Sequence, residues 1–171
     1  MSKLKNRFSD EVKGKYSSIV MILPWDQIKD LRYNRSLSSR LLGNYSLDDL
    51  KRLPIKNVST SRSELYVFVP AKLENVGKDL IQGYGYIYSD NQEVKVGSTK
   101  MRSYLSLHRS EKTMLILRGG ISLVSRNGSL FNDLADRKLK SDHELTDLFK
   151  QLDSDLLLVG KSASGVSSFL L

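Results

Sequence analysis

The sequence predicts a single α+β domain with a mostly antiparallel sheet, a few short helices and a flexible basic N-terminal arm. The 171 residues are the length of one domain, and a hydrophobic content of 40% is enough for one core. Strand-like and helix-like segments follow each other in no regular alternation, which favours α+β over a doubly wound fold. Since no repeat or Pro-rich linker divides the chain, we expect an arm over residues 1–17 and one globular domain over residues 18–171.

The arm is predicted from a basic opening segment. Its cations are Lys3, Lys5, Arg7, Lys13 and Lys15. Leu4, Phe8 and Val12 recur every four residues, which is the spacing of one helical stripe. Two interpretations stay open: the arm folds on a lipid surface or a partner, or it is a solvated, frayed terminus.

The first half of the globular domain contains two predicted strands and two predicted short helices. The apolar, β-branched residues 18–23, which precede a proline, predict a strand, and so do residues 64–69. Residues 36–42, which end at a glycine, predict a brief helix. Residues 46–53 predict another helix, because Ser46 is a good N-cap residue and two acids follow in the first turn.

The second half begins with a predicted hairpin over residues 83–96, in which residues 89–91 connect two strands. The second strand of this hairpin alternates polar and apolar residues strictly. A helix is predicted over residues 98–108, because apolar residues recur there at helical spacing and Ser98 or Thr99 can cap it.

Three further segments complete the predicted fold. Residues 113–117 and 121–125 predict a second strand pair that a short Arg-Gly-Gly connection joins. Residues 141–152 predict the clearest helix, because a Ser-x-x-Glu capping box precedes apolar residues at helical spacing. Residues 156–159 predict a buried strand, and a turn over residues 160–165 leads to a last apolar segment.

Charge is unevenly distributed along the chain, whose formal net charge is +8. Residues 1–72 hold 14 basic and 7 acidic side chains, residues 73–130 hold 8 and 5, and residues 131–171 hold 5 and 7. A field of this shape favours polyanions, either phosphate backbones or an anionic lipid leaflet, and salt should weaken the attraction.

Several classes of protein are excluded by composition. The chain has no cysteine, so it forms no disulfide and has neither a thiol nucleophile nor a common zinc site. Its longest aliphatic run, residues 19–23, is far shorter than the about 20 residues of a membrane-spanning helix. The basic start lacks the pattern of a secretory signal, so we expect a cytosolic location at first.

The sequence offers few candidates for catalysis. His143 lies inside the predicted capping box and His108 near a helix end, and both settings give histidine structural uses. Asp48 and Asp49 are explained by the positive end of a helix dipole. We therefore predict no catalytic residue, no metal, no cofactor and no enzymatic activity, with a hydrolase or nuclease that uses His108 as the alternative.

Three tyrosines, Tyr84, Tyr86 and Tyr88, alternate along the predicted hairpin. They would share one face of a strand, and such a face can stack the bases of a single-stranded nucleic acid. The alternative interpretation is a half-buried packing surface.

Four stretches of the chain occur in an informative order. A Met-Ser-Lys-Leu-Lys start and a later Lys-Gly-Lys, residues 13–15, lie in the basic arm. The hairpin of residues 83–96, with its central Ser-Asp-Asn, precedes the helix of residues 100–108 and the strand pair of residues 113–125. The sequence Gly-Lys-Ser-Ala-Ser-Gly, residues 160–165, precedes the final apolar segment. In this layout the chain resembles the matrix proteins of rhabdoviruses, particularly the short forms of plant cytorhabdoviruses.

The resemblance implies a viral structural protein that self-associates and bridges the ribonucleoprotein to an anionic membrane during virion assembly. Its partners would be the nucleocapsid RNA, anionic inner-leaflet lipids bound peripherally and further copies of the chain as a homo-oligomer. Its expected locations are the host cytoplasm, at membranes, and the virion. The resemblance does not extend to a Pro-rich motif that recruits budding machinery, because the prolines are Pro24, Pro54 and Pro70.

The arm is the predicted contact with lipid headgroups or nucleocapsid phosphates. The residues concerned are Lys3, Leu4, Lys5, Arg7, Phe8, Lys13 and Lys15. Each cation near an anionic leaflet contributes about 1 kcal/mol, so the attachment is reversible and needs apolar insertion or self-association to persist. The alternative function is a single-stranded nucleic-acid-binding or movement-type protein, which would use the same cations together with the three tyrosines.

Overall fold

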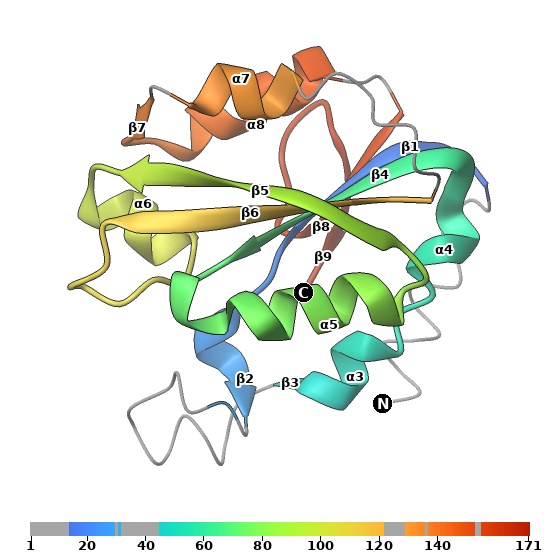
Figure 1. Ribbon diagram of the computed structural model, residues 1–171. Coiled ribbons are helices and arrows are strands. Elements are labelled where there is room, and N and C mark those ends of the chain that lie inside the picture. The colour runs from blue at the N-terminus through green and yellow to red at the C-terminus, as the bar shows by residue number, and fades with distance from the viewer. Residues whose placement is uncertain (1–13, 30, 32–44, 122–128, 136, 153–154) are drawn as a thin grey trace.

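A computed structural model of the chain describes residues 14–29, 31, 45–121, 129–135, 137–152 and 155–171. Its main sheet has seven strands in the order β7-β5-β6-β4-β1-β8-β9 (Figure 1). The strands are β1 (Tyr16–Ile22), β4 (Ser59–Val69), β5 (Ile87–Val96), β6 (Thr113–Gly120), β7 (Lys138–Leu139), β8 (Leu156–Gly160) and β9 (Ser167–Leu170). A small second sheet pairs β2 (Ile28–Lys29) with β3 (Tyr45–Ser46).

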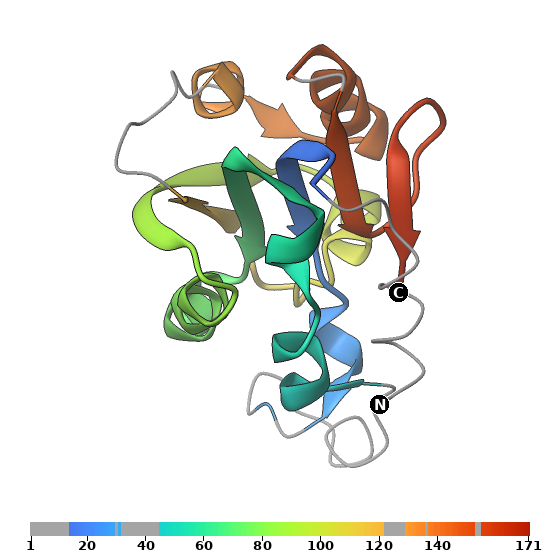
Figure 2. The same ribbon diagram turned by 90° about the vertical axis from the view of Figure 1, so that its right-hand side faces the viewer.

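Helices cover both faces of the main sheet. The helical elements of the described residues are the 3₁₀ turns η1 (Trp25–Gln27) and η2 (Ala71–Leu73) and the α-helices α3 (Leu47–Lys51), α4 (Ile55–Val58), α5 (Glu74–Gly83), α6 (Thr99–Tyr104), α7 (Ser129–Leu134) and α8 (Asp142–Leu152). Helix α5 lies on one face, and α7 and α8 lie on the other (Figures 1 and 2). Helices α6 and α4 lie at opposite ends of the strands (Figure 1).

The sheet is mixed. Strand β1 pairs in parallel with β4 and β8, and β6 lies antiparallel between β4 and β5. The prediction of one α+β domain is confirmed, but the prediction of a mostly antiparallel sheet is wrong, since four of the six pairings among these strands are parallel. The pairings are parallel because the long connections after β1 and β4 carry the chain back to the edge of the sheet at which the strand began. The next strand of the crossover then runs in the same direction.

The core is built from the alternation of side chains along β4. On one face Phe68 meets the ring of Phe149 on α8 edge-to-face, with 6.3 Å between centroids. On the other face Val69 lies against α5 at Gly77, where a side chain would come within 2.6 Å of Leu117. The sheet is therefore packed on both faces, and Gly77 allows the close approach of α5.

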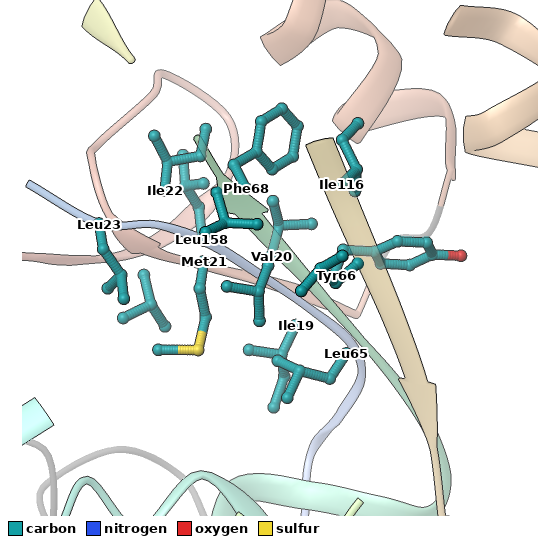
Figure 3. Close-up of a cluster of buried hydrophobic side chains, with 14 of the residues drawn as sticks. Ile19, Val20, Met21, Ile22, Leu23, Leu65, Tyr66, Phe68, Ile116 and Leu158 are labelled. Atoms are coloured by element: carbon teal, nitrogen blue, oxygen red, sulfur yellow. The ribbon is translucent and has the colours of Figure 1, made fainter. Parts of the chain in front are cut away.

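Strand β1 lies at the centre of this core. Its residues Ile19–Ile22 are completely buried, as expected of a strand covered on both faces (Figure 3). Trp25 follows the strand, is also completely buried, and donates a hydrogen bond from Nε1 to the Phe68 carbonyl at 2.9 Å. Sequence reasoning predicted β1 within two residues, because a run of β-branched apolar residues has few other uses.

The boundary of the arm is the first of three further corrections. The Gly14 amide donates to the Asn57 carbonyl at 2.9 Å, and Tyr16 already pairs with Ser59 across β1 and β4. Tyr16 and Ser17, assigned to the arm from sequence, therefore belong to β1, and Gly14 is tied to the segment before β4. The rest of the predicted arm, residues 1–13, lies outside the described residues, as does the predicted helix of residues 36–42.

The second correction concerns the hairpin of residues 83–96. Gly83 ends α5, Tyr84 and Gly85 form the turn after it, and residues 87–96 form one continuous strand, β5, whose antiparallel partner is β6. The predicted connection, Ser89–Asn91, lies inside this strand at an irregular register.

The third correction concerns the second strand pair. The Arg-Gly-Gly segment predicted to connect its strands instead continues β6 to Gly120, opposite Glu64 of β4. Of the predicted second strand, only Ile121 lies within the described residues.

Two helix caps follow the prediction. Ser46 caps α3, since its Oγ accepts from the Asp49 amide at 3.1 Å while Asp49 accepts from the Ser46 amide. Ser98 caps α6 in the same way, accepting from the Met101 amide at 3.0 Å. Helix α8 begins at Asp142 as predicted, but the capping box differs: the Ser141 Oγ accepts from the His143 amide at 3.1 Å, and the Glu144 Oε1 accepts from the Lys140 amide at 3.3 Å.

Candidate cationic groove

The parallel strands end together at one edge of the sheet, which we call the carboxyl edge. Residue pairs Ile22–Phe68 and Met21–Val159 align the ends of β1, β4 and β8, and Val69 pairs with Leu115 of β6. Lys95, next to the end of β5, pairs with Thr113 at the start of β6. In open sheets, ligands bind at the carboxyl ends of parallel strands.

A groove of about 340 Å³ opens at the carboxyl edge. Its lining residues are Lys95, Val96, Gly97, Arg102, Lys112, Thr113 and Lys138. Four of these seven are cationic, and the described lining contains no carboxylate. We call this feature the cationic groove.

The position of the lysines is set by strand pairing. Lys95 of β5 and Lys138 of β7 are direct register partners, so two like charges lie side by side. Gly97 allows the Lys138 side chain to lie flat on β5, because a Cβ at residue 97 would be 2.8 Å from the Lys138 Cγ. Neither lysine forms an ion pair within the described part of the chain. Adjacent unpaired cations cost stability, which is typical of a site that keeps its charge for a ligand.

A second hollow, of about 300 Å³, adjoins the groove. It is lined by Asp26, Thr99, Arg102, Ser103, Ser106, Leu107, His108 and Arg109, so Arg102 lines both. We call it the polar hollow. The Arg102 Nη2 donates to the Thr99 hydroxyl at 3.3 Å, whereas its Nε is buried and meets no acceptor in the described residues.

The loop after α6 shapes the polar hollow. Ser106 has a φ of 60°, which ends the helix predicted to reach residue 108 and turns the chain back. The Leu107 amide then donates to the Arg102 carbonyl at 2.8 Å. Glu111 holds His108 in this loop, since its Oε1 accepts from the His108 amide at 3.3 Å and lies 3.6 Å from the imidazole Nδ1.

Tyr104 connects α6 to the end of β8. The Lys161 Nζ lies 5.0 Å from the centroid of the Tyr104 ring, within range of a cation–π contact. Burial, together with the charge of Asp142, raises the pKa of Tyr104 to about 12. Lys161 therefore adds a further cation to the carboxyl edge.

The structure contradicts the tyrosine stacking face predicted from sequence. Tyr84 and Tyr86 are buried, and their hydroxyls bond inside the protein, to the Leu50 carbonyl and to Ser59 and Ser63. Burial raises the pKa of both phenols. Tyr84 and Tyr86 precede β5, so they do not alternate along a strand and cannot present their rings to a base.

The third tyrosine, Tyr88, is partly buried on β5. The Lys78 Nζ lies 4.9 Å from its ring centroid, and its hydroxyl accepts from Asn91 at 2.7 Å. A single ring engaged in this way makes no stacking platform.

The predicted arm residues are described only at their last cation. Lys15 is exposed, with its Nζ 5.3 Å from the ring of Tyr16, and it precedes the amino end of β1. It therefore lies at the opposite end of the strands from the cationic groove, separated by the seven residues of β1 or about 20 Å. Lys3, Leu4, Lys5, Arg7, Phe8 and Lys13 lie outside the described residues.

Sequence reasoning missed the cationic groove. Lys95, Arg102, Lys112 and Lys138 are spread over 44 residues, with no spacing that signals a site. The signal that was available is the amphipathic pattern of α5, with apolar residues Leu73, Val76, Leu80 and Ile81. Recognising α5 as a crossover helix would have predicted parallel strands and a common carboxyl edge.

Comparisons with known proteins leave the family of the chain open. No protein-family model matches it, and no curated protein shows a similar sequence. Within the described ranges, no helix combines the length and the apolar character needed to cross a bilayer. The same ranges contain no cluster of three histidine or acidic side chains suited to a metal ion.

Proposed function

We propose that this protein is a structural, polyanion-binding assembly protein of the viral matrix type, which bridges a ribonucleoprotein to an anionic membrane. The observation that carries the proposal is the cationic groove, in which four cations face one space with no carboxylate in the described lining. Such a lining gains little from a neutral ligand and much from a chain of phosphates.

The arrangement of charge supports a bridging role in particular. A bridge needs two binding regions that do not compete for one ligand. Lys15 precedes the amino end of β1, whereas the cationic groove lies at the carboxyl edge. A polyanion held by one region therefore leaves the other free for a second partner.

The experiment is co-sedimentation of the protein with single-stranded RNA and with vesicles that contain anionic lipid, over a salt series. A groove variant changes Lys95, Lys112 and Lys138 to Glu, and an arm variant changes Lys3, Lys5, Arg7, Lys13 and Lys15 to Glu. We expect each variant to lose one partner more than the other and to prevent the co-sedimentation of RNA with vesicles.

The matched control reverses three exposed cations that belong neither to the groove lining nor to the arm, Lys51, Arg52 and Lys150, and should retain the bridge. Retention of full RNA and vesicle binding by both the groove and the arm variants contradicts the proposal. Loss of binding in the control to the same degree also contradicts it, because the attraction would then follow net charge alone.

A second candidate function is hydrolysis of a phosphodiester with assistance from His108. One observation favours it: the polar hollow brings the imidazole, supported by Glu111, beside the serines Ser103 and Ser106. Incubation of the protein with RNA tests it, since cleavage that disappears in His108→Gln would establish the activity.

A further inference from the structure

The lining of the polar hollow differs in kind from that of the cationic groove. The groove has four cations and no described carboxylate, whereas the hollow combines two guanidinium groups, one imidazole and three hydroxyls with the carboxylate of Asp26. A carboxylate repels a simple anion, so a bare phosphate fits the hollow worse than the groove. The hollow instead suits a group that carries hydrogen-bond donors beside a negative charge.

The size of the hollow limits the ligand. About 300 Å³ is at the lower end of the range for small-molecule sites, so the hollow accepts one compact moiety and excludes a polymer chain or a membrane surface. Leu107 supplies an apolar wall.

Two planar side chains, the imidazole of His108 and the guanidinium of Arg109, also line the hollow. Bases of single-stranded RNA stack on imidazole and guanidinium planes as well as on aromatic rings.

Arg102 joins the two spaces. It lines both, and its buried Nε meets no acceptor in the described residues. A guanidinium that lines both spaces suits a phosphate group lying at the boundary of groove and hollow. The same phosphate would belong to a backbone lying in the groove, which places its attached sugar and base beside the hollow.

We propose that the polar hollow binds one nucleoside of a single-stranded RNA whose backbone lies in the cationic groove, with the connecting phosphate on Arg102. The base stacks on the plane of Arg109, and Asp26 accepts a hydrogen bond from a ribose hydroxyl or a base amino group. The inference rests on the proposed function, since it requires RNA in the groove, and it names RNA over lipid as the ligand of this edge.

The decisive variant is Arg109→Lys, which keeps the charge and removes the plane. Binding is measured by fluorescence anisotropy for three probes: a single-stranded RNA oligonucleotide, inorganic polyphosphate of equal charge, and vesicles of phosphatidylserine. We expect RNA affinity to fall by about fivefold to thirtyfold, the loss of one stacked base, while the other two affinities stay unchanged. The control is Arg62→Lys on the exposed start of β4.

A second variant, Asp26→Asn, guards against an effect of Arg109→Lys on folding. Removal of the carboxylate should raise the affinity for polyphosphate but not for RNA, so the ratio of RNA affinity to polyphosphate affinity falls. Asp79→Asn on α5 is the control and should leave this ratio unchanged. Equal changes for all three probes, or an unchanged ratio of RNA affinity to polyphosphate affinity in both variants, overturn the nucleoside site. A groove variant that still binds RNA with full affinity overturns the proposed function instead.

Discussion

Arg118 and Asp90 form a two-point ion pair across strands β6 and β5. The Nε donates to Oδ1 at 2.7 Å and Nη2 donates to Oδ2 at 2.6 Å, between residues that are direct register partners. Burial disfavours the Arg118 charge, but Asp90 outweighs this effect and raises the pKa of Arg118 above its usual value. The guanidinium also lies 4.9 Å from the ring centroid of Phe131 on α7. This pair therefore links the sheet to the helix layer that covers it.

We expect Asp90→Asn to lower the free energy of unfolding by about 1–2 kcal/mol, because it weakens two charge-assisted hydrogen bonds and leaves the Arg118 charge buried. The loss stays moderate because the Asp90 side chain is 44% exposed. Urea denaturation at pH 7 measures it. Asp79→Asn, in an exposed position on α5, is the control, and equal midpoints for the two variants would rule out a stabilising role for the pair.

Gly160 ends β8 in a conformation that only glycine adopts easily. Its φ is 105°, and a Cβ there would lie 2.0 Å from the Ile22 carbonyl oxygen on β1. We expect Gly160→Ala to cost more than about 2 kcal/mol or to prevent folding, because the clash involves backbone that cannot move aside. Gly83→Ala at the end of α5 meets nothing within 4 Å and should be neutral or stabilising by up to about 1 kcal/mol. Thermal melts of both variants check the contrast.

Structural elements could be predicted from the sequence where the residues that determine them are neighbours in the chain. The caps at Ser46 and Ser98 and the helix α8 were predictable, because each follows from neighbouring side chains. The parallel order of β1, β4 and β8 was not, since it depends on long connections rather than on the strands themselves. Strand β5 was interpreted as part of a hairpin because Asp90 is of a residue type that is common in turns, whereas in the structure it lies within the strand and pairs with Arg118.

The candidate site was harder to predict than the fold. The prediction rested on net charge, which indicates a class of ligand but not a position. Lys95 and Lys138 become neighbours only through the pairing of β5 with β7, a two-residue strand that propensity does not reveal. Tyr86 shows the reverse case: its spacing from Tyr84 suggested one shared strand face, either for stacking or for packing, but a turn at Gly85 breaks the alternation and both rings are buried.

The buried hydroxyl of Tyr104 and its raised pKa lead us to expect an unusual dependence of stability on pH. Its buried hydroxyl meets no partner in the described residues, so Tyr104→Phe should be neutral or stabilising by up to about 1 kcal/mol at pH 7. Its pKa is raised from 10.0 to about 12, so the unfolded chain loses this proton first as the pH rises. The contribution is thus intact below pH 10 and lost between pH 10 and 12, and the variant should gain stability over the wild type in that window.

The measurement is urea denaturation of both proteins at pH 7, 10 and 11.5 or thereabouts, with tyrosinate absorbance as a second probe. Tyr84→Phe is the contrasting variant, because it loses a hydrogen bond to the Leu50 carbonyl and should be less stable than the wild type at pH 7. An identical pH profile for wild type and Tyr104→Phe would show that the phenol titrates alike in both states.

Tyr86 provides a test of the corrected role of the tyrosines. Its hydroxyl contacts Ser59 and Ser63, so Tyr86→Phe should cost about 1–2 kcal/mol by leaving buried serine hydroxyls short of a partner. RNA affinity should not change, because the ring is buried and precedes the amino end of β5, whereas the cationic groove lies at the carboxyl end of that strand. Guanidinium denaturation and RNA anisotropy on the same sample separate the two effects, and a loss of RNA affinity without a loss of stability would restore the stacking role.

Lys138 should show a trade between stability and binding, since it is the register partner of Lys95. Lys138→Gln removes the repulsion between two adjacent cations and should raise the free energy of unfolding by about 0.2–1 kcal/mol. It should also lower RNA affinity and reduce the slope of log affinity against log salt by about 0.7, the value for one phosphate contact on a single strand. Lys78→Gln is the control, because Lys78 is already paired with Glu74 at 3.2 Å on α5 and lines neither the groove nor the hollow. A stability gain without a change in salt slope would mean that Lys138 does not contact the phosphate backbone. A stability gain together with a reduced salt slope would show that the Lys138 charge binds the ligand although it destabilises the fold.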